Sequence, residues 1–370
     1  MAERERTLEE LGLSRPFGSI YAGRRVLVTG HTGFKGSWLA LWLQALGAEV
    51  GGLALDPDTD PAHWNLLGLQ LEHDARVDLR DAAGVYAAVM KFQPEVVFHL
   101  AAQPLVRRGY REPVTTFDSN VGGLVHLLEA VRACASVRAV VNATTDKVYE
   151  ARATSIGYRE DDRLGGHDPY SASKAAAELV TQSYAASFLA PRGVAVATAR
   201  AGNVVGGGDW SEDRLVPDLV RAAASGQPLR LRNPQATRPW QHVLEPLSGY
   251  LCIGQALLTG DTVGDAWNFG PAADATLAVG DVVARLHREW PQLQVEHDRG
   301  PHPHEAAQLM LDCSKAGREL GWRPVWNADM TLQRTAQWYH AFAADRSVRS
   351  RDDLAAYLAD ARRCGLEWAA

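Results

Sequence analysis

Cysteine is scarce in this chain of 370 residues, and its four cysteines lie far apart, at positions 134, 252, 313 and 364. No CxxC pair exists, so the spacing supplies neither a thiol redox motif nor a pair of zinc ligands, and a disulfide framework is not expected at this size. The histidines form no HxxxH pattern or His/Cys cluster. We therefore expect a cytoplasmic protein that holds no metal.

An excess of positive charge and long apolar runs are also missing. Lys and Arg total 38 against 44 Asp and Glu, a net charge of −6, which disfavours a nucleic-acid partner. The most apolar stretch, residues 38–55, is interrupted by polar residues and glycines, so no membrane span is expected. The first twenty residues carry charges throughout and have no apolar core of a secretory signal.

What the chain does contain is an alternation of β-rich and helical segments. With 46% hydrophobic and 22% charged residues, it has the composition of a globular protein of two or three domains. Repeated alternation predicts an α/β fold with a doubly wound parallel sheet of the Rossmann type. The expected strands are 25–29, 49–55, 96–100, 139–143 and 194–200, and the expected helices are 38–46, 117–134 and 171–189.

Glycine and proline become denser after Arg200, which indicates a smaller, partly interleaved second domain. We expect an N-terminal extension at 1–21 and a dinucleotide-binding domain at 22–200, to which 242–275 returns. The remaining segments, 201–241 and 276–370, are expected to form the substrate domain.

The first βαβ unit contains a glycine-rich loop. Thr29-Gly-His-Thr-Gly-Phe-Lys-Gly36 follows a predicted strand and opens a helix, the context in which glycines let a backbone approach a pyrophosphate. The helix N-terminus adds free N–H groups and a positive dipole end. A simple turn between strand and helix is the alternative.

Further cofactor contacts are expected where the next strands end. Asp56 is placed to accept both hydroxyls of an adenosine ribose, which favours NAD over NADP, although the basic residues Lys35, Arg24 and Arg25 lie nearby. Its alternative role is that of a turn residue before Pro57. Asp78 is a candidate acceptor from the adenine amino group, or else an N-cap of a following helix. The predicted cofactor-binding residues are Gly30, Thr32, Gly33, Phe34, Lys35, Gly36, Asp56, Asp78, Leu79, Leu100, Ala101, Ala102, Tyr170 and Lys174.

A YxxxK pattern supplies a candidate general base. Tyr170 and Lys174 are four residues apart in a predicted helix and therefore share one face. A neighbouring ammonium, together with an oxidised nicotinamide, would lower the pKa of the phenol towards neutrality. Thr145, which follows another predicted strand, is placed to bond the sugar hydroxyl that Tyr170 deprotonates.

These motifs carry a family resemblance. The glycine loop, HLAAQ, TTDKVY, DPYSASK, RAGNVVGGGDW and RPWQHV together resemble the extended short-chain dehydrogenase/reductase superfamily and, within it, the CDP-glucose 4,6-dehydratases. The similarity runs from about Tyr21 to the LDCSKAGRELGWRP segment. The resemblance implies a cytoplasmic lyase of deoxysugar biosynthesis with NAD as cofactor, a nucleotide-sugar substrate and a homodimer formed through two helices that flank the sheet.

The resemblance also implies how the reaction proceeds. Tyr170, held by Lys174, removes the C4 hydroxyl proton while Thr145 aligns that oxygen and NAD takes the C4 hydride. Lys147 then removes the C5 proton, which requires it to be neutral, and protonated Asp146 donates to the departing C6 hydroxyl. The hydride returns to C6. Alternatively, Lys147 only forms an ion pair with Asp146.

Substrate contacts follow from the same resemblance. Arg238 matches a position that binds the diphosphate, Asn203 matches a nearby donor, and Asn120 matches a residue that holds substrate-side water or backbone. A surface ion pair is the alternative role of Arg238. Other nucleotide-hexose 4,6-dehydratases, a nucleotide-sugar 4-epimerase and a non-catalytic NAD-binding regulatory protein remain as alternative functions.

Overall fold

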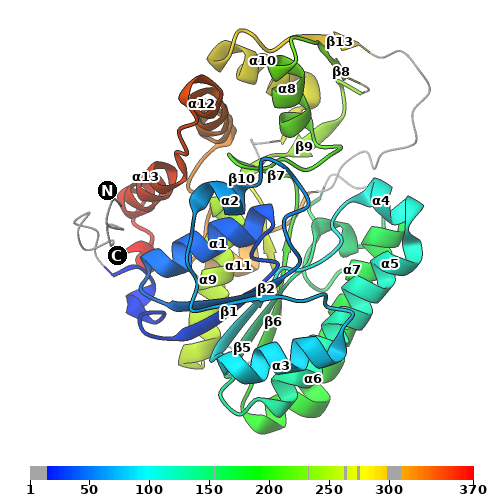
Figure 1. Cartoon of the computed structure of the whole chain (residues 1–370), viewed down its shortest axis with the longest axis vertical. Helices are drawn as coiled ribbons and strands as arrows, with labels where there is room; N and C mark the ends of the chain where they lie inside the picture. The colour runs from blue at the N-terminus through cyan, green and yellow to red at the C-terminus, as the bar shows by residue number, and fades with distance from the viewer. Residues whose placement is uncertain (1–14, 153–155, 232, 262–264, 273–275, 298–309) are drawn as a thin grey trace.

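A computed structural model describes residues 15–152, 156–231, 233–261, 265–272, 276–297 and 310–370. The chain forms two lobes, a lower lobe built on a large sheet and a smaller upper lobe (Figure 1). Most of the predicted N-terminal extension, residues 1–14, lies outside the described residues. None of the described helices is long and apolar enough to span a bilayer.

In the described part of the chain, seven parallel strands make the sheet of the lower lobe, in the order β11-β6-β5-β4-β1-β2-β3. The chain moves outward from β1 in both directions, so the order reverses between β1 and β4, the place where open α/β sheets bind ligands. The predicted fold class is confirmed. The strands are β1 (Arg25–Thr29), β2 (Glu49–Ala54), β3 (His73–Arg76), β4 (Val96–His99), β5 (Ala139–Ala143), β6 (Ala195–Ala201) and β11 (Ala266–Phe269).

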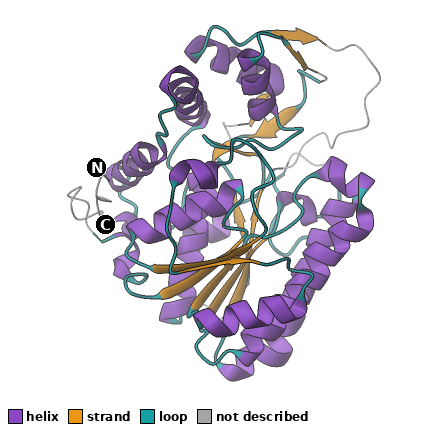
Figure 2. Cartoon of the chain, in the orientation of Figure 1, coloured by secondary structure: helices purple, strands orange, loops and turns teal. Residues whose placement is uncertain are grey.

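Helices cover both faces of this sheet (Figure 2). One face carries α3 (Ala82–Phe92), α6 (Gly123–Ala133) and α7 (Pro169–Tyr184), whose apolar side chains pack with Leu27 and Val97. The other face carries α1 (Phe34–Ala45), α9 (Leu244–Thr259) and α13 (Ser350–Arg363). Because both faces are covered, the central strands are short apolar runs without polar alternation. Shorter helices are α2 (His63–Leu67), α4 (Val106–Arg111), α5 (Pro113–Phe117) and α11 (Ser314–Glu319).

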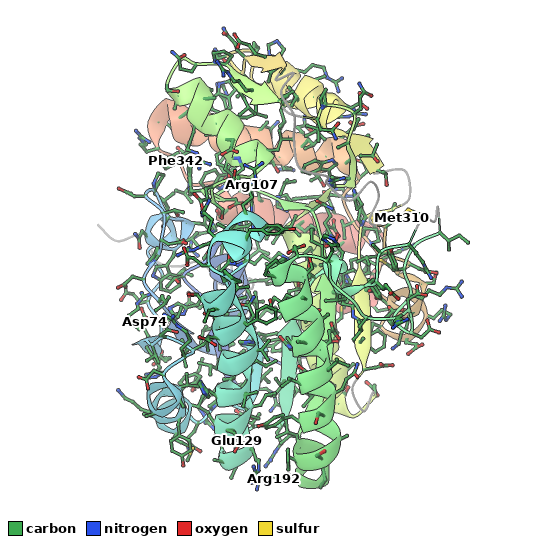
Figure 3. The ribbon with its side chains drawn as sticks, turned by 90° about the vertical axis from the view of Figure 1, so that its right-hand side faces the viewer. Asp74, Arg107, Glu129, Arg192, Met310 and Phe342 are labelled. Carbon is green, nitrogen blue, oxygen red and sulfur yellow. The ribbon has the colours of Figure 1, made fainter. Side chains whose placement is uncertain are left out.

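The upper lobe has its own apolar core, which includes Trp240, Leu286 and Trp338. Figure 3 shows Phe342 of this lobe in the upper part of the molecule, and Glu129 and Arg192 near its lower end. The lobe consists of α8 (Leu215–Ala224), α10 (Val279–Glu289), α12 (Ala328–Asp345) and the short strands β7 (Val204–Val205), β8 (Leu229–Leu231), β9 (Thr237–Pro239), β10 (Gln241–His242), β12 (Thr276–Ala278) and β13 (Val295–His297).

The predicted domain limits differ from this packing at two places. Phe17 and Tyr21, which we expected in the N-terminal extension, are buried in the core of the lower lobe, where Phe17 stacks on Trp368. The segment from Ala316 to Trp326 and helix α13 also belong to that core, although we expected all of 276–370 in the second domain. Sequence pattern could not show this, because these residues reach the sheet only through long-range packing.

Candidate active site

The glycine loop connects β1 to α1 at the switch point of the sheet. Gly30 has φ +74°, and a Cβ there would lie 2.7 Å from the backbone nitrogen of Ala101. A Cβ on Gly36 would lie 2.0 Å from the carbonyl oxygen of Gly30, so these two glycines let the loop pack against itself and β4. Among the described residues, a Cβ on Gly33 would contact only the Gly30 oxygen, at 3.4 Å. The opening at Gly33, ahead of the α1 N-terminus, therefore fits the pyrophosphate of a dinucleotide.

Other predicted cofactor residues gather at the carboxyl ends of β1 to β4. The Thr32 hydroxyl donates to the carbonyl oxygen of Leu55 at 2.9 Å, which fixes the loop beside the end of β2. The backbone N–H groups of Leu100 and Ala101 donate to the Thr29 hydroxyl oxygen, both at 3.2 Å, and draw the end of β4 against β1. Phe34 and Lys35 begin α1, and Ala102 directly follows Ala101.

The two carboxylates that we expected to contact the adenosine, Asp56 and Asp78, each have a partner in the structure. The Asp56 side chain is 85% exposed, and Arg76 lies 3.6 Å from it. Hydrogen bonds from Arg80 hold the pKa of Asp78 below its usual range, against the effect of burial. The N-cap of α3 is Asp81, which accepts from the N–H of Gly84, so the alternative N-cap role of Asp78 is wrong. Leu79, next to Asp78, is buried.

Helix α7 places the YxxxK residues. It begins after Asp168, whose carboxylate caps the helix by accepting from the N–H of Ser171 at 3.0 Å. The ammonium of Lys174 donates to the carbonyl oxygen of Ala143 at the end of β5, at 3.0 Å. Burial lowers the pKa of Lys174 to about 8, although Glu178 opposes the shift.

The Tyr170 phenol lies beside the residues that follow β5. Burial raises the pKa of this phenol, whereas Lys147, a hydrogen bond with Thr145 and, more weakly, Arg214 lower it. From sequence we expected Lys174 and an oxidised nicotinamide together to lower this pKa. Among the protein groups Lys147 is the leading cation, and the net shift that these groups alone produce is upward. The difference arises because burial costs a phenolate more than these neighbours return.

Thr145, Asp146 and Lys147 form a connected triplet. The hydroxyl of Thr145 donates to Asp146 Oδ1 at 3.0 Å, and Lys147 Nζ lies 3.3 Å from the same oxygen. Asp146 is 1% exposed, and its Oδ2 is buried without a hydrogen-bond partner among the described residues. Burial lowers the pKa of Lys147, but Asp146 and Tyr170 raise it, and the net shift is upward. The structure thus shows the ion pair that we gave as the alternative for Lys147.

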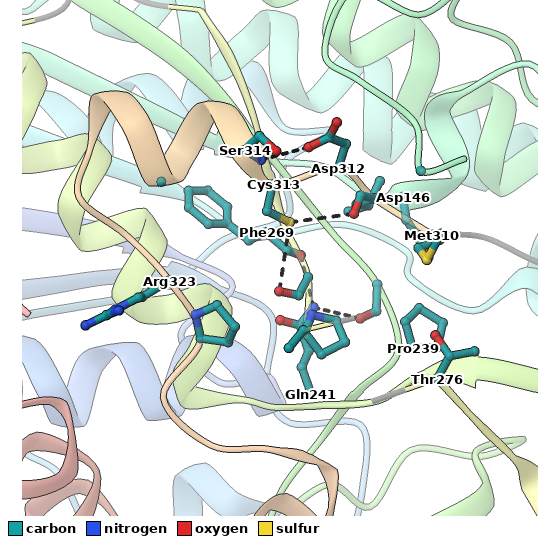
Figure 4. Close-up of a pocket in the computed structure, with 18 of the residues that line it drawn as sticks. Asp146, Pro239, Gln241, Phe269, Thr276, Met310, Asp312, Cys313, Ser314 and Arg323 are labelled. Carbon is teal, nitrogen blue, oxygen red and sulfur yellow. Dashed lines mark hydrogen bonds between the residues drawn. The ribbon is translucent and has the colours of Figure 1, made fainter. Parts of the chain in front are cut away.

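A cavity of about 430 Å³ opens on the other side of Asp146. Gly202, Gln241, Phe269 and Cys313 contribute to its wall, and Figure 4 shows Asp146 and Arg323 on opposite sides of it. The Asp146 carboxylate therefore lines this cavity and is also near enough to the Tyr170 phenol to affect its pKa. Within the described ranges no group of three or more His, Cys, Asp or Glu is arranged to hold a metal ion.

The predicted substrate residues differ in the contacts that they make in the structure. The amide of Asn120 accepts from the N–H of Gln103 at 2.8 Å and donates to the Ser173 hydroxyl at 2.9 Å, so it holds backbone on the substrate side. Asn203 adopts φ 46°, and its Nδ2 is buried without a partner among the described residues. Arg238 lies in β9, near enough to Lys147 to lower the pKa of that ammonium.

Sequence reasoning missed two charged residues at this site, Glu178 and Arg214. Glu178, one helical turn beyond Lys174, is fully buried and pairs with Arg200 at 3.0 Å. Its position four residues after Lys174 was a usable signal. Arg214 pairs with Asp209 at 3.0 Å and contributes, after burial, to lowering the pKa of Lys35 to about 7. No spacing in the sequence indicated Arg214.

Comparisons with known proteins agree with this geometry. The family model described as GDP-mannose 4,6 dehydratase matches residues 27–335. The chain is 45% identical to a CDP-glucose 4,6-dehydratase of Salmonella typhimurium, over 93% of this chain and 99% of that protein. It is 28% identical to a dTDP-glucose 4,6-dehydratase of Xanthomonas campestris pv. campestris, over 85% and 92% of the two chains.

A solved structure shows the same fold. The UDP-glucose 4-epimerase of Thermus thermophilus, in complex with NAD, superposes with a TM-score of 0.73 and 27% identity, over 85% of this chain and 99% of that one. Fold alone does not separate epimerases from dehydratases. The family model and the relative of 45% identity do, and the Asp146–Lys147 pair next to the phenol agrees with them. This chain belongs to the nucleotide-sugar 4,6-dehydratase family.

Proposed function

We propose that this chain is an NAD-dependent hydro-lyase that converts CDP-D-glucose to CDP-4-dehydro-6-deoxy-D-glucose. The observation that carries the proposal is the connection of Tyr170 through Thr145 to the Asp146–Lys147 pair. A phenol alone serves oxidation at C4, but loss of water from C5 and C6 needs a second acid and a second base. The CDP-glucose 4,6-dehydratase of 45% identity supports cytidine diphosphate glucose as the substrate.

We assign the cofactor site to the glycine loop with Thr32, the Asp56 and Asp78 carboxylates and the ends of β1 and β4. The opening at Gly33 fits the pyrophosphate, and Asp56 suits the ribose hydroxyls of NAD. When bound, the nicotinamide accepts the C4 hydride and returns it to C6, so the reaction has no net redox change. Lys174, which bonds the end of β5, is placed to hold the nicotinamide ribose.

In the first half of the reaction Tyr170 accepts the C4 hydroxyl proton, with Thr145 as the neighbouring hydroxyl that aligns the sugar oxygen. Oxidation makes C4 a carbonyl, which acidifies the proton on C5. The second half requires a neutral amine at Lys147 and a protonated carboxyl at Asp146. Transfer of one proton from Lys147 to Asp146, across 3.3 Å, produces both forms at once. The ion pair of the structure therefore holds the right number of protons for the dehydration.

We place the nucleotide sugar between the two lobes. Arg238 is suited to bidentate contact with the diphosphate, and the amide nitrogen of Asn203 is buried without a partner in the described part of the chain. The lower lobe, including α9, β11 and the segment from Ala316 to Trp326, is the NAD-binding domain in this proposal, and the upper-lobe elements β7 to β10, α8, β12, α10, β13 and α12 form the nucleotide-sugar domain. Arg214, which affects the pKa values of both Lys35 and Tyr170, adds positive charge at the junction.

We also propose a homodimer through the face formed by α5 and α7. Val114 is 72% exposed and Leu179 is 58% exposed there, while Phe117 is partly exposed beside them. Exposed apolar side chains that cluster on adjacent helices favour association. Light scattering should show a dimer for the unchanged chain and a monomer for Leu179→Lys. A dimer that persists in this variant places the interface elsewhere.

The function is tested by following the hydrogen of C4. CDP-glucose carrying deuterium at C4 should give a 4-keto product with deuterium at C6, detected by mass spectrometry and NMR. Asp146→Asn should still reduce the bound cofactor, visible as absorbance near 340 nm, but release no 6-deoxy product. Asp312→Asn, a carboxyl on the same cavity wall, should keep turnover. A product without label at C6 would overturn the proposal and leave the 4-epimerase alternative.

A further inference from the structure

The proposed reaction leaves two protons in the wrong places. Tyr170 gains the proton of the C4 hydroxyl. Asp146 loses a proton to the C6 hydroxyl, which leaves as water, and Lys147 returns to C5 the proton it removes there. After one turnover Tyr170 therefore carries one proton too many and Asp146 one too few. A second turnover requires that a proton move from the phenol to the carboxylate, or that both groups exchange with solvent separately.

The side chain between these two groups is Thr145. Its hydroxyl donates to Asp146 Oδ1 at 3.0 Å and lies close enough to the Tyr170 phenol to lower the pKa of that phenol. A hydroxyl can donate one hydrogen bond while it accepts another, so it can pass a proton without holding a net charge. Thr145 is 4% exposed, Asp146 is 1% exposed and Tyr170 is 9% exposed, so protein surrounds the whole connection.

We propose that Thr145 relays this proton and resets the site after each turnover. The O–H bond of Tyr170 breaks as the proton moves to Thr145 Oγ1, the O–H bond of Thr145 breaks towards Asp146 Oδ1, and the carboxylate becomes a carboxylic acid. No atom changes its oxidation state, and Thr145 ends with the same number of protons as it had at the start. This inference rests on the proposed function, because it concerns the proton balance of that reaction.

Lys147 also pairs with Asp146, at 3.3 Å, but acts on the phenol through its charge. Two further groups near Tyr170 on the substrate side are engaged elsewhere. The ammonium of Lys174 donates to the carbonyl oxygen of Ala143, and the amide of Asn120 is engaged with Gln103 and Ser173. The competing route is water in the cavity behind Asp146, on the side of Gly202. That route reprotonates the carboxylate but leaves the proton on Tyr170. Transfer through Thr145 instead removes the proton from Tyr170 and protonates Asp146 in one event.

The relay moves a proton from a phenol to a carboxylate, against the ordinary order of their acidities. We therefore expect it to contribute to the rate of the cycle and to slow in D₂O. Removing the hydroxyl affects the first turnover only through alignment of the sugar, but affects every later turnover through the reset as well. The ratio of the two rates thus separates a relay from an alignment role.

The test is a rapid-quench experiment with CDP-glucose on the unchanged chain, Thr145→Val and Thr145→Ser, all loaded with NAD. In Thr145→Val we expect one equivalent of keto sugar per site, followed by a steady state at least tenfold slower than that first turnover. This slow phase should show a solvent deuterium isotope effect. Thr145→Ser restores the hydroxyl and should return the ratio of the two phases to that of the unchanged chain.

Two outcomes would overturn the relay. One is that Thr145→Val slows the first turnover and the steady state by the same factor, which assigns the hydroxyl to alignment only. The other is a slow phase without a solvent isotope effect, which indicates slow product release. Failure of the proposed function is distinguishable from both, because the unchanged chain would then form no keto sugar in either phase.

Discussion

Gly202 lies directly against the carboxylate of Asp146. A Cβ on this glycine would be 1.9 Å from Oδ2 and 2.1 Å from Cγ of the aspartate. The backbone at Gly202 is fixed at the end of β6, where its carbonyl oxygen accepts a hydrogen bond from Gln241 at 2.9 Å. The absence of a side chain at position 202 therefore sets where the proposed acid can lie.

We predict that Gly202→Ala displaces Asp146 and slows release of the 6-deoxy product. A shift of about 1 Å at a reacting group costs roughly 100-fold in rate, because proton transfer depends on alignment. Oxidation at C4 uses Tyr170 and should be affected less. The measurement compares cofactor reduction in the first turnover with formation of the keto sugar.

The matched control is Gly270→Ala in the wall of the same cavity. A Cβ there would meet Cys313 Sγ at 3.5 Å and Leu311 Cβ at 3.6 Å, which are ordinary contacts. This variant should keep its rate of dehydration. If the two alanine variants behave alike, the packing of Gly202 against Asp146 has no part in positioning the acid.

Tyr170→Phe should abolish turnover while the cofactor stays bound. Removing a general base typically costs about 100- to 10,000-fold in rate. Tyr250→Phe is the matched control, since that phenol is fully buried and its oxygen has no hydrogen-bond partner in the described part of the chain. Steady-state kinetics and titration with NAD provide the two measurements. Substantial turnover by Tyr170→Phe would remove the phenol from its role.

Glu178→Gln should destabilise the fold strongly. The carboxylate is fully buried and accepts from the hydroxyl of Thr198 at 2.7 Å and from Arg200 at 3.0 Å. Breaking a buried ion pair leaves an uncompensated charge and costs about 3–5 kcal/mol in the free energy of unfolding. The same substitution at Glu129, whose pair with Arg132 is exposed on α6, should cost at most about 1 kcal/mol. Denaturant titration measures both, and equal losses would show that burial of Glu178 carries no special cost.

The parts of the site that sequence could predict are those fixed by local geometry or by strand ends. Tyr170 and Lys174 share a face because four residues make about one helical turn. The glycine loop, Asp56 and Thr145 each follow a strand, and in a parallel sheet all such ends meet at one edge. Asp146 and Lys147 directly follow Thr145 in the sequence, so their position beside it could be predicted as well. The strand at 25–29 was predicted with its observed limits, because apolar residues bounded by glycine mark it clearly.

What sequence could not predict depends on contacts between distant segments. Gly202 meets Asp146 across two strand ends, and Arg214 reaches Lys35 from the upper lobe. Strand β3 was missed because its residues, His73-Asp-Ala-Arg76, have no continuous apolar run at the sheet edge. The upward shift that the protein groups alone give the pKa of Tyr170 depends on burial, which no spacing reveals.

Asp56→Ser should relax the discrimination between NAD and NADP. The carboxylate repels a 2′-phosphate, and Arg76, now 3.6 Å from it, would be left to attract one. Two unit charges about 4 Å apart in water interact by about 1 kcal/mol, so removing the repulsion of a doubly charged phosphate should change the ratio of dissociation constants by tenfold or more. Asp58→Ser, an exposed carboxylate on the same loop, is the control. Unchanged ratios in both variants would place the ribose away from Asp56.

Glu245 should make stability depend on pH in a definite direction. It is fully buried in α9 and accepts from the N–H of Trp326 at 2.7 Å and from the hydroxyl of Tyr357 at 2.8 Å. Burial raises its pKa from 4.5 to about 7, although these hydrogen bonds oppose the shift. Between these two values the folded state binds more protons than the unfolded state, so the stabilising contribution, complete below pH 4.5, is lost as pH rises through 7.

The expected loss is about 3 kcal/mol, because each unit of pKa shift corresponds to about 1.4 kcal/mol. Glu245→Gln cannot ionise, so the difference in unfolding free energy between the unchanged chain and this variant should shrink by that amount from pH 4.5 to 8. Burial also raises the pKa of Asp353 to about 7, so this residue shifts stability in the same direction in both proteins. Its contribution cancels when the difference between the two proteins is taken. Denaturant titrations at five or more pH values supply the curves. Parallel curves for the two proteins would mean that Glu245 ionises equally easily in the folded and unfolded chain.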